Sequence, residues 1–414
     1  MSTKRNIEIM SPAGSWESLQ AALQGGANSI YFGVEQLNMR ARASNNFNLE
    51  DLVKIANLCN VKGVKTYITL NTIIYNHDLN LMKKIIHTAK ESGISAIIAS
   101  DQAVISYACS IKMEVHISTQ CNVTNLETVH FYSRFADVVV LSRELSLIQV
   151  KEITSGIKKE QIKGPSGKLL KIEIFAHGAL CVAVSGKCYM SLHTANSSAN
   201  RGACIQNCRK TYTITDIEDG HQFEIDNEYI LSPKDLCTIG FLDQILGAGV
   251  SVLKIEGRGR APEYVKATTN CYREAADSYL EGTYNQEKVK GWISKLKTVY
   301  NRGFWDGYYL GQKLGEWAEV HGSKANKKKI YVGIAKRYFP KIQVAEFDME
   351  SHHLKKGDNI LITGKKTGVL EAVAVEMRLD DKTVEEVKKG DNFSLKLKNP
   401  VRAKDKLYKV IDCE

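Results

Sequence analysis

The feature that most constrains the fold is a regular alternation of short β-branched runs with amphipathic segments, which continues from the N-terminus to about residue 256. In the amphipathic segments apolar residues recur three and four positions apart, as in the stretch from Trp16 to Gly26, which ends in two glycines. The alternation predicts eight strands separated by helices. The predicted strands are Ile7–Ser11, Ser29–Gly33, Lys65–Asn71, Ala96–Asp101, Glu114–Gln120, Asp137–Ser142, Lys171–His177 and Val252–Gly257.

Eight repeats of a strand and a helix favour an α/β fold built on a closed parallel barrel of the (β/α)8 type. An open doubly wound sheet is the alternative. Such a sheet usually carries a glycine-rich phosphate loop after its first strand. Here the first strand is followed by Ser11-Pro-Ala-Gly-Ser, which is too short for that loop. We therefore expect the barrel.

The last quarter of the chain has a different pattern. From Ile330 onward, alternating segments are separated by Lys-Gly-Asp and similar turns, which predicts a small all-β barrel. We place a β/α barrel domain at residues 1–322 and the C-terminal domain at residues 323–414. The chain has a net charge of +10, and the C-terminal domain alone has 21 basic and 14 acidic residues. This excess suggests a polyanionic partner, although a lysine-rich solvated surface explains it equally well.

The chain shows no sign of membrane insertion or export. No stretch approaches the run of about 20 apolar residues that a membrane helix needs. The first residues lead directly into a strand pattern and lack the apolar core of a signal peptide. We expect a cytoplasmic protein without membrane contact, in which disulfides are disfavoured.

Five of the ten cysteines fall in a long insertion at residues 179–237 that interrupts the alternation after the seventh strand. They are Cys181, Cys188, Cys204, Cys208 and Cys237, spaced C-x6-C-x15-C-x3-C-x28-C. Four thiolates that converge on one point can hold a [4Fe–4S] cluster or a structural zinc. Zinc ribbons prefer C-x2-C pairs, which do not occur here, so the spacing favours the cluster. Zinc and the absence of any metal stay open as alternatives.

Polar residues gather at the predicted C-terminal ends of the strands, which is where β/α barrels build their sites. They are Asn71, Asp101, Gln120, Arg143, Glu144, His177, Glu256 and Arg258. A helix cap or a loop hydrogen bond explains any one of them, but the set favours a functional rim. His177 also lies close in sequence to Cys181, so a Cys–His peptidase is an alternative. No cysteine is marked as a unique nucleophile.

Several motifs together resemble the U32 (collagenase-like) family. The longest are the stretches from Glu173 to Ser191 and from Asn200 to Arg209. The shorter ones are Ser11-Pro-Ala-Gly, Tyr31-Phe-Gly, Asn38-Met-Arg-Ala-Arg-Ala, Ser232-Pro-Lys-Asp-Leu-Cys and Lys254-Ile-Glu-Gly-Arg. The resemblance covers the whole chain, and the C-terminal domain is similar to the second domain of elongation factor Tu.

The resemblance implies hydroxylation without O2. One branch of the family makes 5-hydroxyuridine at the wobble position of tRNA with prephenate, and another hydroxylates a ribosomal RNA cytidine. Shorter relatives pair up to hydroxylate ubiquinone precursors. The expected domain order of this chain, a barrel followed by one small β domain, is similar to that of the tRNA hydroxylase branch. The resemblance also implies a [4Fe–4S] cluster held by Cys181, Cys188, Cys204 and Cys237, with Cys208 as an alternative ligand.

We therefore expect a tRNA uridine hydroxylase that uses prephenate, with a peptidase, hydroxylation of another RNA base, or a non-catalytic RNA-binding factor as alternatives. Four arginines are candidates to bind the two carboxylates of prephenate, because arginine binds carboxylate in a bidentate way. They are Arg40, Arg42, Arg143 and Arg258. His177 and Glu256 are candidate proton-transfer groups.

Four aromatic residues that follow the last predicted helix are candidates to stack on an extruded base, with packing against the barrel as the alternative. They are Phe304, Trp305, Tyr308 and Tyr309. Besides tRNA and prephenate, a related U32 subunit or a second copy of the chain is a candidate partner.

Overall fold

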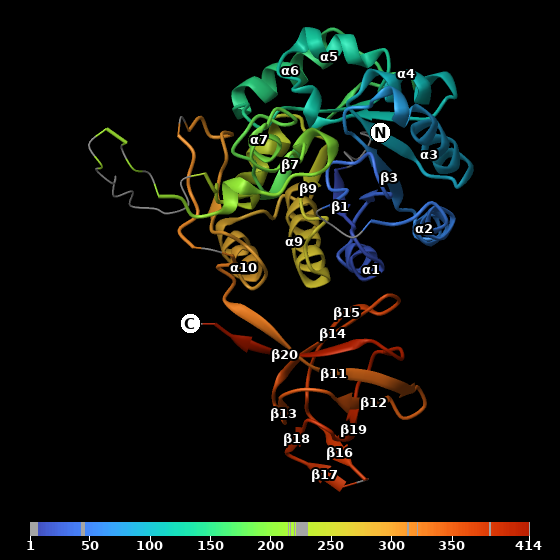
Figure 1. The fold of residues 1–414 in the computed structure, drawn as a ribbon, viewed down its shortest axis with the longest axis vertical. Helices are drawn as coiled ribbons and strands as arrows, with labels where there is room; N and C mark the ends of the chain where they lie inside the picture. The colour runs from blue at the N-terminus through green and yellow to red at the C-terminus, as the bar shows by residue number, and fades with distance from the viewer. Residues whose placement is uncertain are drawn as a thin grey trace.

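A computed structural model describes most of the chain, as a β/α barrel with an antiparallel β domain below it (Figure 1). The described residues are 7–42, 46–213, 215, 217–218, 220, 231–312, 314–320, 322–380 and 382–413. Of the predicted cysteine-rich insertion, residues 214, 216, 219 and 221–230 lie outside the described residues.

Eight parallel strands close the barrel, because β9 pairs with both β1 and β7. The strands are β1 (Glu8–Pro12), β2 (Ser29–Gly33), β3 (Lys65–Leu70), β4 (Ala96–Ala99), β5 (Val115–Ile117), β6 (Val138–Val140), β7 (Lys171–Ala179) and β9 (Val252–Ile255). They correspond in order to the eight predicted strands, with ends that differ by at most three residues. The α/β class and the parallel barrel are confirmed.

Two short strands at the barrel were not predicted. Strand β8 (Asp235–Cys237) runs antiparallel to the end of β7. In the register of the two strands, Cys237 stands opposite His177. Strand β10 (Phe304–Trp305) runs parallel to β8. The chain therefore returns from the cysteine-rich insertion as an extra strand beside β7.

Helices surround the barrel, as Figure 1 shows. They are α1 (Trp16–Gln24), α2 (Asp51–Asn60), α3 (Leu79–Glu91), α4 (Gln102–Ser110), α5 (Leu126–Ser133), α6 (Leu147–Lys159), α8 (Leu242–Gly247), α9 (Pro262–Leu280) and α10 (Gln286–Lys297), while α7 (Met190–Ala195) lies in the insertion. Several helices begin at a polar residue that caps the N-terminus. The Ser15 side chain accepts a hydrogen bond from the Ser18 amide, and the Asp101 side chain accepts one from the Ala103 amide. No helix in the described part of the chain is long and apolar enough to cross a membrane.

The barrel core has two parts because strand side chains alternate in direction. Residues such as Ile9 and Phe32 belong to the large cluster shared with the helices. Their sequence neighbours Met10 and Tyr31 belong to a separate buried cluster drawn from six of the barrel strands. Layers of this kind fill the interior of a β/α barrel, so only the strand ends are left for a site.

The C-terminal domain consists of antiparallel strands around its own core. The strands are β11 (Lys327–Phe339), β12 (Val344–Met349), β13 (His353–Lys355), β14 (Asn359–Gly364), β15 (Gly368–Val373), β16 (Met377–Leu379), β17 (Lys382–Val384), β18 (Glu386–Lys388), β19 (Asn392–Lys396) and β20 (Lys406–Asp412). The main sheet has the order β15-β14-β20-β11-β12-β19-β16-β17, and β13 pairs with β18. The predicted all-β domain is confirmed. Among the described strands no pairing joins β15 to β17, so backbone hydrogen bonds do not complete a ring.

The two domains meet where the β14–β15 hairpin packs on α1 and α9. The Gln24 side chain donates to the Thr367 carbonyl at 2.9 Å and accepts from the Val369 amide at 2.9 Å. Gly368 lies between these partners with a φ of +68°, and an added Cβ would lie 2.6 Å from Gln24 Oε1. The turn therefore requires glycine for its backbone conformation and for the close approach of Gln24.

Candidate functional site

A pocket of about 280 Å³ opens at the C-terminal ends of the barrel strands. Its floor includes Tyr31 from β2, Thr69 from β3, Phe175 from β7 and Lys254 from β9. Residues between Ala179 and Arg209 of the cysteine-rich insertion form much of its wall. The pocket thus occupies the face on which β/α barrels build their sites.

The pocket is strongly cationic. Its only acidic lining residue among those described is Glu256, whereas seven lining residues are basic. The basic residues are Arg40, Arg143, Arg209, Lys254, Arg258, Arg260 and Arg302. A cleft lined by charges of one sign concentrates ligands of the opposite sign, so this pocket is suited to an anion.

Glu256 is held as a carboxylate by its neighbours. Arg40 Nη2 lies 3.0 Å from Glu256 Oε1. Burial by itself would raise the pKa of Glu256, but the positive charges of Arg40, Arg260 and Arg143 lower it below the ordinary 4.5. Glu256, a predicted proton-transfer group, therefore lies in the pocket as a proton acceptor rather than a proton donor at neutral pH.

Arg258 and Arg143, both predicted to bind substrate, also line the pocket. Arg258 Nη1 donates to Asn38 Oδ1 at 3.0 Å and to Thr69 Oγ1 at 2.9 Å, and burial lowers the pKa of Arg258 to about 10. The Arg143 guanidinium lies 3.9 Å from the centre of the Phe175 ring, and its buried Nε has no hydrogen-bond partner in the described part of the chain. A ligand oxygen would satisfy such a donor.

Arg42 and His177 lie outside the set of lining residues. Arg42 is exposed, and its backbone amide donates to the Gly202 carbonyl at 3.3 Å. His177 is buried between the rings of Tyr264, Tyr272 and Phe304. Burial lowers the pKa of His177 to about 3, so the imidazole is neutral at pH 7. This placement argues against the predicted proton-transfer role of His177.

Four of the five clustered cysteines line the pocket: Cys181, Cys188, Cys204 and Cys208. Burial raises the pKa of Cys208, and negative charge on the other three raises it further against the opposing effect of Arg209. The Cys208 thiol therefore lies within electrostatic reach of the other three. No three His, Cys, Asp or Glu side chains among the described residues have the arrangement of a formed metal site.

Cys237, the fifth cysteine of the group, lies away from the other four. It is buried in β8 outside the pocket lining, and burial raises its pKa to about 12. Tyr272 lies within hydrogen-bond reach of its thiol. The placement favours Cys208 over Cys237 as the fourth ligand of a cluster, and the ligand set stays a prediction.

Arg201 ties the middle of the insertion to the loop after β3. Its guanidinium makes two bonds to the Asp78 carboxylate, donates to the Ile73 carbonyl at 2.7 Å and lies 4.3 Å from the centre of the Tyr75 ring. The Ile73 amide donates in turn to the Asn200 carbonyl at 3.2 Å. This contact fixes one side of the pocket wall.

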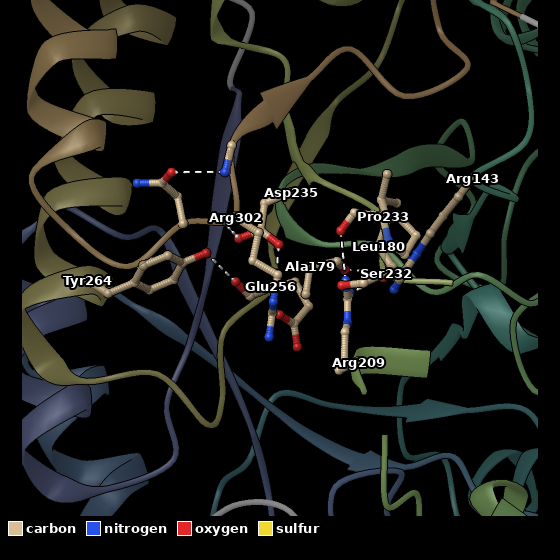
Figure 2. Close-up of polar contacts among 12 residues, drawn as sticks. Arg143, Ala179, Leu180, Arg209, Ser232, Pro233, Asp235, Glu256, Tyr264 and Arg302 are labelled. Carbon is tan, nitrogen blue, oxygen red and sulfur yellow. Dashed lines mark hydrogen bonds and ion pairs between the residues drawn. The ribbon is translucent and has the colours of Figure 1, made fainter. Parts of the chain in front are cut away.

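Arg209 ties the two ends of the insertion together. Figure 2 shows its guanidinium between Leu180, where the insertion begins, and Ser232 and Pro233, where the chain returns to the barrel. It donates to the Leu180 carbonyl at 2.6 Å, to the Pro233 carbonyl at 2.7 Å and to Ser232 Oγ at 2.8 Å. The cysteine-bearing wall is therefore attached at both ends and at its middle.

Residues 14–319 match the model of peptidase family U32. The chain belongs to this family. A collagenase of Porphyromonas gingivalis is 55% identical over 98% of this chain and 98% of its own. The tRNA hydroxylation protein P1 of Bacillus subtilis is 29% identical over 86% of this chain and 83% of its own. The 23S rRNA 5-hydroxycytidine C2501 synthase of Escherichia coli is 29% identical over 88% of this chain and 54% of its own.

Sequence reasoning missed the residues that hold the pocket wall of this U32 chain. Arg201 and Arg209 stand inside a motif that was used only for its cysteines, and Asp78 follows β3 in a stretch without a predicted role. The only available signal was the presence of two arginines within a cysteine-rich loop. Their partners lie in distant segments, so sequence alone could not reveal the tether.

We expect the Asp78–Arg201 tether of the U32 barrel to weaken in acid. Burial by itself would raise the pKa of Asp78, but hydrogen bonds from Arg201 and the Tyr75 amide, with the charge of Arg201, lower it below the ordinary 3.8. Because the folded-state pKa is lower than the unfolded one, the ionised carboxylate stabilises the fold above about pH 3.8. This stability is lost as the pH falls through the folded-state pKa.

Asp78→Asn should therefore lower the free energy of unfolding by roughly 1–2 kcal/mol at pH 6 and by less at pH 3. Urea unfolding followed by tryptophan fluorescence measures this, because all four tryptophans lie before residue 323. The control is Asp277→Asn, which removes a half-exposed carboxylate paired with Arg273 on the same helix. It should lower the free energy of unfolding by less than Asp78→Asn does. An Asp78→Asn effect of equal size at both pH values would contradict the prediction.

Proposed function

We propose that this U32 enzyme hydroxylates a base of RNA, that its substrate is the wobble uridine of tRNA, and that prephenate is the hydroxyl donor. The observation that carries the proposal is the cationic pocket at the barrel mouth, walled by four cysteines. The names of the B. subtilis and E. coli relatives support RNA hydroxylation as the reaction class.

Prephenate carries two carboxylates, and the pocket offers cations that could receive them. Arg143 presents a buried Nε that has no hydrogen-bond partner among the described residues. Arg258 and Lys254 lie on the same floor. A cavity of about 280 Å³ suits a small organic dianion. Arg40 would act through its ion pair with Glu256, which fixes the direction of that carboxylate.

The cofactor in this proposal is a [4Fe–4S] cluster. Cys181, Cys188, Cys204 and Cys208 would hold it, because thiolate is the ligand that iron–sulfur clusters use and these four line one pocket. When bound, the cluster supplies one-electron chemistry. The raised pKa of Cys208 means that its thiol must lose a proton on binding, so cluster binding should weaken at low pH.

The remaining features fit a cytoplasmic enzyme with an RNA partner. All ten cysteines are free, as is usual in a reducing compartment. The C-terminal domain carries an excess of positive charge that would add salt-sensitive affinity for phosphates. We propose the cytoplasm as its location, and a related U32 subunit or a second copy of the chain as a further partner.

Peptidase activity is the second candidate, because the 55% identical relative is named a collagenase. The geometry gives this candidate little support. A thiol peptidase needs a histidine beside its nucleophile. His177, four residues before Cys181, is buried outside the pocket and is neutral at pH 7. His193, on α7 within the insertion, is exposed and also lies outside the pocket lining.

The test is an assay with protein that has been purified and reconstituted with iron and sulfide under anaerobic conditions. Unmodified tRNA and prephenate are added, and nucleosides are analysed by mass spectrometry. Formation of 5-hydroxyuridine only when prephenate is present supports the proposal. Unmodified uridine from cluster-loaded protein contradicts it, and thiol-sensitive cleavage of gelatin by metal-free protein would establish the peptidase instead.

A further inference from the structure

Exposed apolar side chains lie on the segments that form the pocket wall and on the loop after β3 that is bonded to it. We name this set the apolar rim; it consists of Ile73, Tyr75, Val184, Tyr189, Leu192 and Ile205. The two tyrosines are the most exposed members, with 52% of Tyr75 and 60% of Tyr189 open to solvent. A concentration of exposed apolar side chains at one pocket suggests a binding surface.

The rim is continuous with the pocket. Val184 is itself a lining residue, and Tyr189, Leu192 and Ile205 each stand next in sequence to one. Ile73 is joined by a backbone hydrogen bond to Asn200, which also lines the pocket. The exposed residues of the rim therefore lie on the same segments that wall the pocket, or on the loop bonded to that wall.

Tyr75 is held beside the pocket wall by Arg201, the arginine of the Asp78–Arg201 tether. The guanidinium of Arg201 lies 4.3 Å from the centre of the Tyr75 ring, and Arg201 follows the lining residue Asn200. A cation over an aromatic ring holds that ring in place. The pair forms a two-layer stack of planar groups beside a cationic pocket, and such a stack can be extended by a third planar group.

We propose that the apolar rim is the docking surface for a single-stranded RNA loop, whose bases stack on Tyr75 and Tyr189 beside the cationic pocket. This inference rests on the proposed function and adds the surface that holds the substrate. Base–aromatic stacking is tolerant of sequence and strengthens binding substantially for each base. Sequence-specific RNA recognition mostly uses unpaired loops, whose bases are free to stack in this way.

Two other ligands fit the surface less well. A double helix keeps its bases inside, so it would present sugars and phosphates to apolar side chains. A peptide could cover the rim, but seven basic lining residues against one acidic residue would favour it only if it were strongly acidic. The combination of aromatic side chains and positive charge matches an unpaired nucleic acid strand.

The experiment measures affinity by fluorescence anisotropy for a labelled RNA stem–loop and for a fully paired RNA of the same length. The full-length chain is compared with Tyr75→Ala and Tyr189→Ala. Each substitution is expected to weaken stem–loop binding roughly 5- to 100-fold. Tyr75→Phe and Tyr189→Phe keep the ring and should retain the affinity. Thermal unfolding confirms that each variant is folded.

Phe131 provides a matched control. It lies on α5, is 49% exposed and is also covered by an arginine, with the Arg134 guanidinium 4.6 Å from its ring centre. Because Phe131 is absent from the pocket lining and the rim, Phe131→Ala should leave RNA affinity unchanged.

The outcomes separate this inference from the proposed function. Selective loss of stem–loop affinity in the two alanine variants supports the docking surface. Folded alanine variants that bind the stem–loop as the parent does would overturn the inference and leave RNA hydroxylation standing. A parent protein that binds neither RNA, or that binds an acidic peptide at the rim in preference to RNA, would also overturn the inference, whereas the nucleoside assay alone decides the proposed function.

Discussion

Cys208→Ala is expected to abolish binding of iron and acid-labile sulfide, whereas Cys237→Ala is expected to retain both. Cys208 lines the pocket with Cys181, Cys188 and Cys204, and the charges of these three act on its thiol. Cys237 is buried in β8, outside the pocket lining. Loss of one of four cysteine ligands leaves an iron without its thiolate, so the effect on cluster content should be nearly complete.

The measurement is iron, sulfide and visible absorbance on protein purified and reconstituted without oxygen. Cys109→Ala serves as the control for loss of a thiol elsewhere in the barrel, since Cys109 lies on α4 and donates to the Phe135 carbonyl. The prediction assigns normal cluster content to this control. A cluster that survives in Cys208→Ala and is lost in Cys237→Ala would restore the ligand set implied by family resemblance.

Glu173→Gln is expected to lower the free energy of unfolding of the barrel by about 3–5 kcal/mol, the usual cost of leaving a buried charge without its partner. Lys254 Nζ lies 2.7 Å from Glu173 Oε1, and the two side chains are almost completely buried. Burial lowers the pKa of Lys254, while the charge and hydrogen bond of Glu173 raise it. Without the carboxylate, burial acts on Lys254 unopposed by its partner.

Urea unfolding followed by tryptophan fluorescence reports this effect. Glu91→Gln, at an exposed position near the end of α3, is the matched control and should change stability by less than about 0.5 kcal/mol. Glu173→Gln combined with Lys254→Met removes both charges and should recover a large part of the loss. If Glu173→Gln alone unfolds like the parent, the buried pair is not a major source of stability.

The pair also affects the proposed anion site, because Lys254 belongs to the pocket floor. The second oxygen of Glu173 lies 4.0 Å from His116 Nδ1, and neither buried atom has a hydrogen-bond partner among the described residues. Such unpaired groups are costly in a core, which makes the Lys254 contact more important to Glu173.

The sequence by itself predicted the barrel, because strand and helix periodicities are local and each of the eight runs is long enough to show them. It also predicted several of the residues that meet at the mouth, since the C-terminal ends of parallel strands lie on one face of a barrel. Arg143, Glu256 and Arg258 were predicted on that ground alone, and all three line the pocket.

Spacing along the chain is a weaker guide inside irregular segments. Family resemblance placed Cys237 in the ligand set with Cys208 as the alternative, because nothing local shows that the chain returns as β8 and buries Cys237 against β7. His177 stands at a strand end like Glu256, yet its ring faces Tyr264, Tyr272 and Phe304 instead of the pocket.

Burial also decided which aromatic rings are exposed and therefore free to stack on a base. Trp305 and Tyr309, candidates for base stacking, are buried, and the Tyr309 hydroxyl donates to the Phe175 carbonyl at 3.0 Å. The exposed rings at the mouth are instead Tyr75 and Tyr189, which carried no signal in the sequence. Periodicity and residue type thus determined the barrel and the face that holds its site. The tertiary structure alone decided which side chains face the pocket, because burial depends on contacts between segments far apart in the chain.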